Sequence, residues 1–118
     1  MKAVLLAAGV ALGGALASSA LAADLAAGQA KAKEICQACH GMDGNSPTAD
    51  YPKLGGQYPD YLAKALRDYK DGKRKNPIMA GMAAPLTPKD IENLAAYYSA
   101  QPAVLEVKPE EGSAHRNK

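Results

Sequence analysis

Two cysteines and a histidine stand close together in the chain, at Cys36, Cys39 and His40, and these are the only two cysteines among the 118 residues. Two thiols three residues apart at a helix end can each add across one vinyl group on the same edge of a porphyrin, while the adjacent imidazole binds the iron. The spacing Cys-x-x-Cys-His therefore predicts one covalently attached haem c, with His40 as an axial ligand of the haem iron.

Two other chemistries use closely spaced cysteines. A redox disulfide of the thioredoxin type requires a strand before the helix, and no alternating strand pattern precedes Cys36. A zinc site requires a fourth ligand, and only His115 remains to supply one. Both interpretations are weaker than haem attachment.

A six-coordinate haem iron needs a second axial ligand on the opposite face. Met42 is too close to His40 to pass round the ring, whereas Met79 and Met82 are separated from it by enough chain to do so. A thioether ligand raises the iron potential relative to a second imidazole such as His115. Spacing alone leaves Met79 and Met82 both open.

The composition describes a thin core. The chain is 47% hydrophobic, but it contains no Phe and no Trp, and many of its apolar residues lie in the first 22. These begin with Met1-Lys2, continue as an uncharged Ala/Leu/Gly run and end in Ala-Leu-Ala, which predicts a secretory signal peptide over residues 1–22. We expect a periplasmic protein with no membrane insertion once the signal is cleaved; an uncleaved leader would be an anchor.

Length and charge narrow the function classes. A chain of this size forms one domain after the leader. The formal net charge is +2, and this weak balance argues against nucleic-acid binding, which requires a strongly basic surface.

Three helices are expected, separated by loops rich in Gly and Pro. Helical spacing of apolar residues predicts them over residues 24–38, 58–72 and 87–101, with loops over 41–57 and 73–86. The second helix has an apolar stripe formed by Tyr58, Tyr61, Leu62, Ala65, Leu66 and Tyr69. The third begins with a Thr87/Asp90 capping box and buries Ile91, Leu94, Ala95 and Tyr98. We assign residues 23–101 to the haem domain and 102–118 to a mobile C-terminal tail.

The predicted fold is all-α, with three to four helices around one haem. The first and last helices are expected to cross where Gly28 and Ala32 meet Tyr97 or Tyr98. Long loops in a small domain usually surround a ligand. The large aliphatic residues in or beside these loops are the candidates for contact with the ring, namely Leu54, Leu66, Ile78 and Leu86.

The basic run from Lys70 to Lys75 has two interpretations. It could steer an acidic redox partner toward the haem, or it is a solvated helix end that favours the helix dipole. Contact between Arg74 and a haem propionate is a further possibility.

Residues 27–101 resemble class I c-type cytochromes, most closely one half of the tandem-haem cytochromes of the c-four type. Three stretches carry the resemblance: Cys36 to Pro47 with the haem motif, Tyr51 to Gln57 (Tyr-Pro-Lys-Leu-Gly-Gly-Gln), and Asn76 to Thr87. The resemblance implies Met79 as the second axial ligand and the Pro52 carbonyl as the group that orients the His40 imidazole. The chain departs from that family in having one haem motif instead of two.

The sequence therefore predicts outer-sphere transfer of single electrons by an iron that cycles between Fe(II) and Fe(III), without enzymatic bond chemistry. The expected partners are redox proteins, with a quinol-oxidising complex or dehydrogenase as donor and an oxidase or reductase as acceptor. The alternative is an electron-transfer subunit of a larger oxidoreductase. A haem sensor or small peroxidase would instead need an open iron site.

Overall fold

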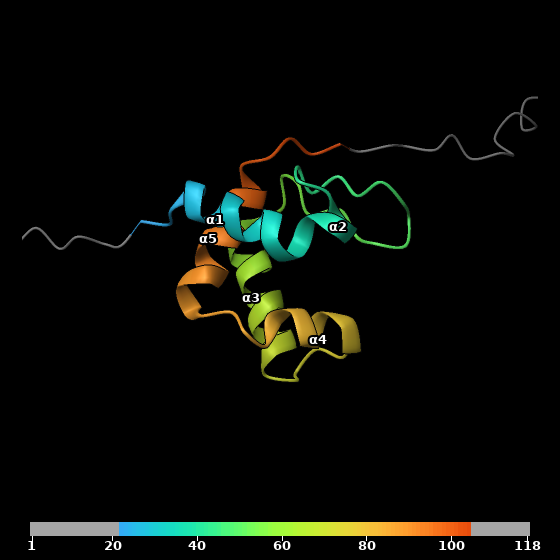
Figure 1. The fold of residues 1–118 in the computed structure, drawn as a ribbon, viewed down its shortest axis with the longest axis vertical. Helices are drawn as coiled ribbons and strands as arrows, with labels where there is room; N and C mark the ends of the chain where they lie inside the picture. The colour runs from blue at the N-terminus through green and yellow to red at the C-terminus, as the bar shows by residue number, and fades with distance from the viewer. Residues whose placement is uncertain (1–21, 105–118) are drawn as a thin grey trace, which may run out of the picture.

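The computed structural model describes residues 22–104, and this part of the chain is helical without a strand (Figure 1). The elements in order are α1 (Leu25–Lys31), the π-helical segment η1 (Ala32–Cys36), α2 (Gln37–His40), α3 (Pro59–Lys70), α4 (Pro77–Ala83) and α5 (Pro88–Ser99). The all-α prediction is confirmed. The predicted signal peptide, apart from Ala22, and the tail beyond residue 104, with His115, lie outside the described residues.

The first predicted helix is a continuous helical run that α1, η1 and α2 form together. Asp24 begins it, because its carboxylate accepts hydrogen bonds from the backbone N–H groups of Ala26 and Ala27. The middle of the run is a π-helical turn, which sequence periodicity did not predict. The run ends at Gly41, whose φ of 79° favours glycine.

The second and third predicted helices correspond to α3 and α5. Pro59 occupies the first turn of α3, where a backbone N–H would have no acceptor within the helix, so proline costs no hydrogen bond there. Thr87 and Asp90 form the predicted capping box at the start of α5. The apolar stripe of α3 is only partly correct, because Tyr58 is 79% exposed and Tyr61 is 51% exposed.

A fourth short helix, α4, lies where the sequence predicted only a loop. The Asn76 side chain caps it by accepting a hydrogen bond from the Met79 backbone N–H at 3.0 Å, and Pro77 follows as the first helical residue. This pair was a helix-start signal, but the seven residues of α4 are too few to show helical periodicity.

The core forms where α1 crosses α5 and α3 packs beside α5 (Figure 1). A Cβ atom on Gly28 would overlap the Asn93 carbonyl oxygen and lie 2.8 Å from the Tyr97 Cβ. The close helix crossing predicted at Gly28 is therefore present. The buried apolar residues of the core are Ala32, Leu62, Ala63, Ala83, Leu86, Ile91, Leu94, Ala95, Tyr97 and Tyr98.

The segment 102–104 is attached to the loop that follows α2. Asn45 donates from Nδ2 to the Pro102 carbonyl at 3.0 Å and accepts from the Val104 N–H at 3.1 Å. Lys53 Nζ donates to the Val104 carbonyl at 3.0 Å. The first residues of the expected mobile tail are thus bonded to the domain.

Across residues 22–104, no helix has the length and apolar character needed to cross a bilayer.

Candidate functional site

His40 is held by a backbone carbonyl from the following loop. Its Nδ1 lies 2.9 Å from the Pro52 carbonyl oxygen, and a carbonyl can only accept, so Nδ1 carries the proton. The lone pair of the imidazole is therefore on Nε2, the nitrogen that a metal can use. The ring is 7% exposed, and Tyr51 packs edge-on against it with ring centroids 6.2 Å apart.

The two cysteines are unpaired thiols at the junction of η1 and α2. Burial raises the pKa of the Cys36 thiol to about 11, so this thiol stays neutral at pH 7. Reactive redox cysteines show the opposite behaviour, a lowered pKa. The environment of Cys36 is therefore unlike that of a redox disulfide.

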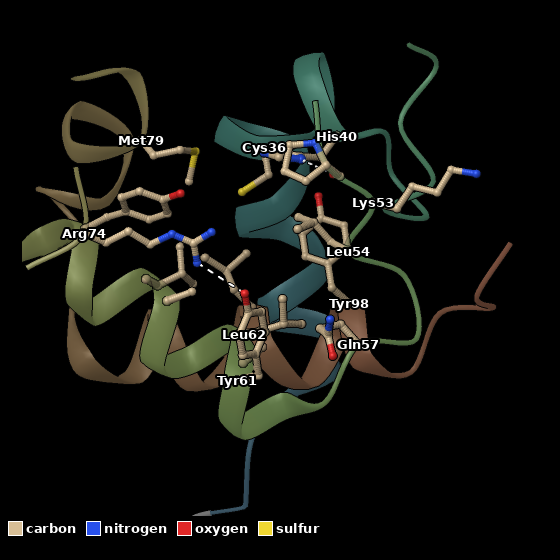
Figure 2. Close-up of a pocket in the computed structure, with 16 residues that line it drawn as sticks. Cys36, His40, Lys53, Leu54, Gln57, Tyr61, Leu62, Arg74, Met79 and Tyr98 are labelled. Atoms are coloured by element: carbon tan, nitrogen blue, oxygen red, sulfur yellow. Dashed lines mark hydrogen bonds between the residues drawn. The ribbon is translucent and has the colours of Figure 1, made fainter. Parts of the chain in front are cut away.

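Two cavities of about 240 and 230 Å³ lie between the cysteine motif and α4. Cys36, His40 and Pro52 line both cavities from one side, and Met79 lines both from the other. In Figure 2 the Met79 sulfur points toward the space occupied by the ends of Cys36 and His40. A nitrogen and a soft sulfur thus approach one cavity from opposite walls.

Met82 is placed differently from Met79. It lines only the second cavity and is 44% exposed, whereas Met79 lines both and is partly buried. The Asn76 side chain that caps α4 bonds to the backbone of Met79. The geometry therefore favours Met79 over Met82 as the residue that faces His40.

The four aliphatic candidates for ring contact separate into different environments. Leu54 and Leu66 line the larger cavity. Ile78 lines the second cavity and is 60% exposed. Leu86 is 3% exposed and belongs to the helical core instead.

The larger cavity is also lined by polar side chains, and most of these were not among the predicted site residues. The Arg74 guanidinium lies over the Tyr69 ring at 4.9 Å. Its Nη1 lies 3.5 Å from the Tyr61 hydroxyl, a contact drawn as a dashed line in Figure 2. Gln57 and Lys53 line the same cavity. The helical spacing of Tyr61 and Tyr69 was the sequence signal that both side chains share one face of α3, but that spacing predicts core residues and not a cavity lining.

Two tyrosines of α5 fix the start of the loop that leaves the motif. The Tyr97 hydroxyl donates to the Met42 carbonyl at 2.9 Å, and the Tyr98 hydroxyl donates to the Gly41 carbonyl at 3.1 Å. Burial raises the pKa of Tyr98, so its hydroxyl remains a donor. The backbone beside His40 is thereby tied to the core.

These residues fit a haem c group. Two thiols stand beside an imidazole whose Nε2 is available, the cavity walls are mainly apolar, and Arg74 supplies a cation in the lining that suits a carboxylate. Among residues 22–104, no group of three or more His, Cys, Asp or Glu side chains is placed so that it could hold a metal ion.

Comparison with known proteins supports the same assignment. Residues 25–100 match the family model for cytochrome c. Cytochrome c4 of Thiocapsa roseopersicina is 51% identical over 79 residues, which cover 67% of this chain and 41% of that protein. Cytochrome c-554(548) of Halomonas halodenitrificans is 45% identical over 83 residues, which cover 68% of this chain and 99% of that protein.

Solved structures of similar proteins share the fold. The crystal structure of reduced cytochrome c4 from Pseudomonas stutzeri matches this chain with a TM-score of 0.64 and 47% sequence identity. The matched region covers 69% of this chain and 47% of the cytochrome c4 chain. The structure of the thiosulfate dehydrogenase TsdBA from Marichromatium purpuratum matches this chain with a TM-score of 0.65 and 32% sequence identity. The matched region covers 75% of this chain and 21% of the TsdBA chain. The chain spans about half of the length, or less, of the cytochrome c4 proteins that it matches. It belongs to the cytochrome c family, as a class I c-type cytochrome of the cytochrome c4 type.

Proposed function

We propose that this chain is a periplasmic electron carrier with one haem c, attached through Cys36 and Cys39 and ligated by His40 and Met79. The observation that carries the proposal is the His40–Pro52 hydrogen bond at 2.9 Å, which leaves Nε2 available in a cavity whose opposite wall holds Met79. The domain assignment at 23–101 and the signal peptide at 1–22 belong to the same proposal.

Haem c, when bound, supplies an Fe(II)/Fe(III) couple that accepts and gives up single electrons. The contribution of the protein is to hold both axial side chains in place, so that little rearrangement accompanies a change of charge. Pro52 fixes the orientation of the imidazole, and the apolar side chains of Leu54 and Leu66 exclude water from the cavity. A thioether from Met79 favours a higher potential than a second imidazole would.

The part of the larger cavity lined by Arg74 would hold a haem carboxylate. Arg74 lies there, oriented by the Tyr69 ring and the Tyr61 hydroxyl. A guanidinium is suited to a carboxylate because it can donate two parallel hydrogen bonds. Cys36 and Cys39 would hold the group through its vinyl carbons, and Arg74 would hold a carboxylate.

Mutation of the two candidate methionines tests the ligand assignment. In protein produced with haem attached, Met79→Ala is expected to abolish the near-infrared sulfur-to-iron charge-transfer band of the ferric form. Met82→Ala is the matched control, from the same helix, and should keep the band. The opposite pattern contradicts the assignment of Met79.

Removal of both thiols tests the attachment. The double variant Cys36→Ala, Cys39→Ala is expected to be free of covalent haem and unfolded, because the described core contains few large side chains. Circular dichroism and haem staining of a denaturing gel measure the two effects. A stable folded chain without haem would contradict the proposed role of haem as part of the core.

A second candidate function is that of an electron-transfer subunit. TsdBA, whose solved structure contains a similar fold, is a thiosulfate dehydrogenase, and a relative in Chlorobaculum tepidum is named as the cytochrome subunit of sulfide dehydrogenase, at 38% identity over 63 residues. Isolation in a stoichiometric complex with a dehydrogenase supports this candidate. Isolation as an exchangeable single protein supports the carrier, whose donor would be a dehydrogenase or quinol-oxidising complex and whose acceptor an oxidase or reductase.

A further inference from the structure

Lys70, the last residue of α3, reaches across to the segment that follows α4. Its ammonium donates hydrogen bonds to the Ala84 carbonyl at 2.8 Å and to the Leu86 carbonyl at 2.5 Å. Ala84 is the C-terminal cap residue of α4, and Leu86 precedes the capping box of α5. One side chain thus joins α3 to the junction of α4 and α5.

The helix that Lys70 holds packs against α3 but buries little of its own surface. It has seven residues, and only Ala83 is fully buried among them. Ile78 is 60% exposed and Met82 is 44% exposed. An isolated helix of this length is unstable in water, so its position depends on contacts at its ends. Asn76 caps the N-terminal end from within the same segment, whereas Lys70 bonds the C-terminal end to α3.

Met79 lies within α4, between its Asn76 cap and the C-terminal end that Lys70 contacts. We propose that Lys70 is a positioning residue that locks α4 against α3 and so keeps the Met79 sulfur directed at the haem iron. This inference depends on the proposed ligation by Met79. An ammonium suits the task because charge-assisted hydrogen bonds are stronger than neutral ones, and because a cation is favoured at a helix C-terminus.

The other lysine of α3 gives a matched control. The Lys64 ammonium pairs with Asp68 within α3 itself, whereas the Lys70 ammonium bonds to carbonyl groups outside α3. Lys64→Met and Lys70→Met remove the same charge from one helix. Only the second removes a contact with the α4 segment.

Imidazole binding to the ferric haem protein tests the proposal, since imidazole replaces Met79 only when α4 moves away. Loss of Lys70 shifts this equilibrium toward the open form, and the apparent affinity rises by the same factor. We expect Lys70→Met to bind imidazole about tenfold more tightly than the wild type. Lys64→Met should bind imidazole with the affinity of the wild type. Lys70→Arg retains a charged donor, so its affinity should lie closer to that of the wild type than to that of Lys70→Met.

A general loss of stability is tested with Asp24→Ala, which removes the cap of α1, far along the chain from α4. Its imidazole affinity should stay at the wild-type value although its melting temperature falls. Unchanged affinity in Lys70→Met, or an equal rise in Asp24→Ala, overturns the role of Lys70 while leaving Met79 as ligand. Absence of the sulfur-to-iron band in the wild type overturns the ligand assignment, and the role of Lys70 with it.

Discussion

The Nδ1 atom of His40 donates a hydrogen bond to the Pro52 carbonyl oxygen at 2.9 Å. His40 is the last residue of α2, whereas Pro52 lies in the irregular loop before α3. The bond determines which ring nitrogen carries the proton and increases the basicity of the other. The loop between α2 and α3 is therefore part of the proposed iron site.

Pro52→Gly is expected to raise the reduction potential. Glycine frees the loop backbone, which weakens the hydrogen bond and makes the imidazole a poorer donor to Fe(III). Spectroelectrochemical titration measures the potential. Pro47→Gly alters the same loop at a residue that is not the partner of His40, and an equal shift in that variant would contradict the mechanism.

Gly28→Ala is expected to destabilise the protein by about 3 kcal/mol, the upper range for overpacking a close contact. The new Cβ would overlap the Asn93 carbonyl oxygen at the crossing of α1 and α5. Denaturant unfolding of the haem protein measures the change.

Gly81→Ala is the control for that substitution. No atom outside its own helical surroundings lies within 4 Å of the added Cβ, and alanine is the better helix former. The variant should be more stable than the wild type by about 0.5 kcal/mol. Similar losses in both variants would show that the crossing is not the cause.

Thr87→Ala should lower the stability by about 1 kcal/mol in denaturant unfolding, because the hydroxyl accepts a hydrogen bond from the Asp90 backbone N–H in the first turn of α5. The backbone N–H of Thr87 in turn donates to Asp90 and is the main cause of the lowered pKa of that carboxyl.

The lowered pKa gives this cap a pH dependence. Stability from Asp90 is present above the pKa of the unfolded chain, near 3.8, and disappears as the pH falls through the lower pKa of the folded state. Asp90→Asn should therefore lose less stability than the wild type between pH 5 and about pH 3. Equal losses in urea titrations at the two pH values would refute the assignment.

Tyr97→Phe is expected to cost about 1 kcal/mol, because it leaves the Met42 carbonyl without its donor. Tyr58→Phe serves as the control, since Tyr58 is 79% exposed, and its stability should match that of the wild type. Thermal unfolding of the two haem-bound variants compares them directly.

The sequence by itself determined the chemistry and most of the helices. The Cys-x-x-Cys-His spacing is local, so Cys36, Cys39 and His40 could be predicted as haem-binding residues from the chain alone, and they stay a prediction. Apolar periodicity located α3 and α5, because each is twelve residues long. The resemblance on which Met79 and Pro52 depended came from motifs, not from periodicity.

The tertiary structure decided what depends on distant pairs. Only the folded chain shows Met79 rather than Met82 on the wall opposite His40, Arg74 against Tyr69 and Tyr61, and Lys70 bonded to the end of α4. The exposure of Tyr58 likewise depends on where α3 meets α5, not on its place in the helical repeat. A helical pattern shows which residues share a face, but contacts between elements determine which part of that face is covered.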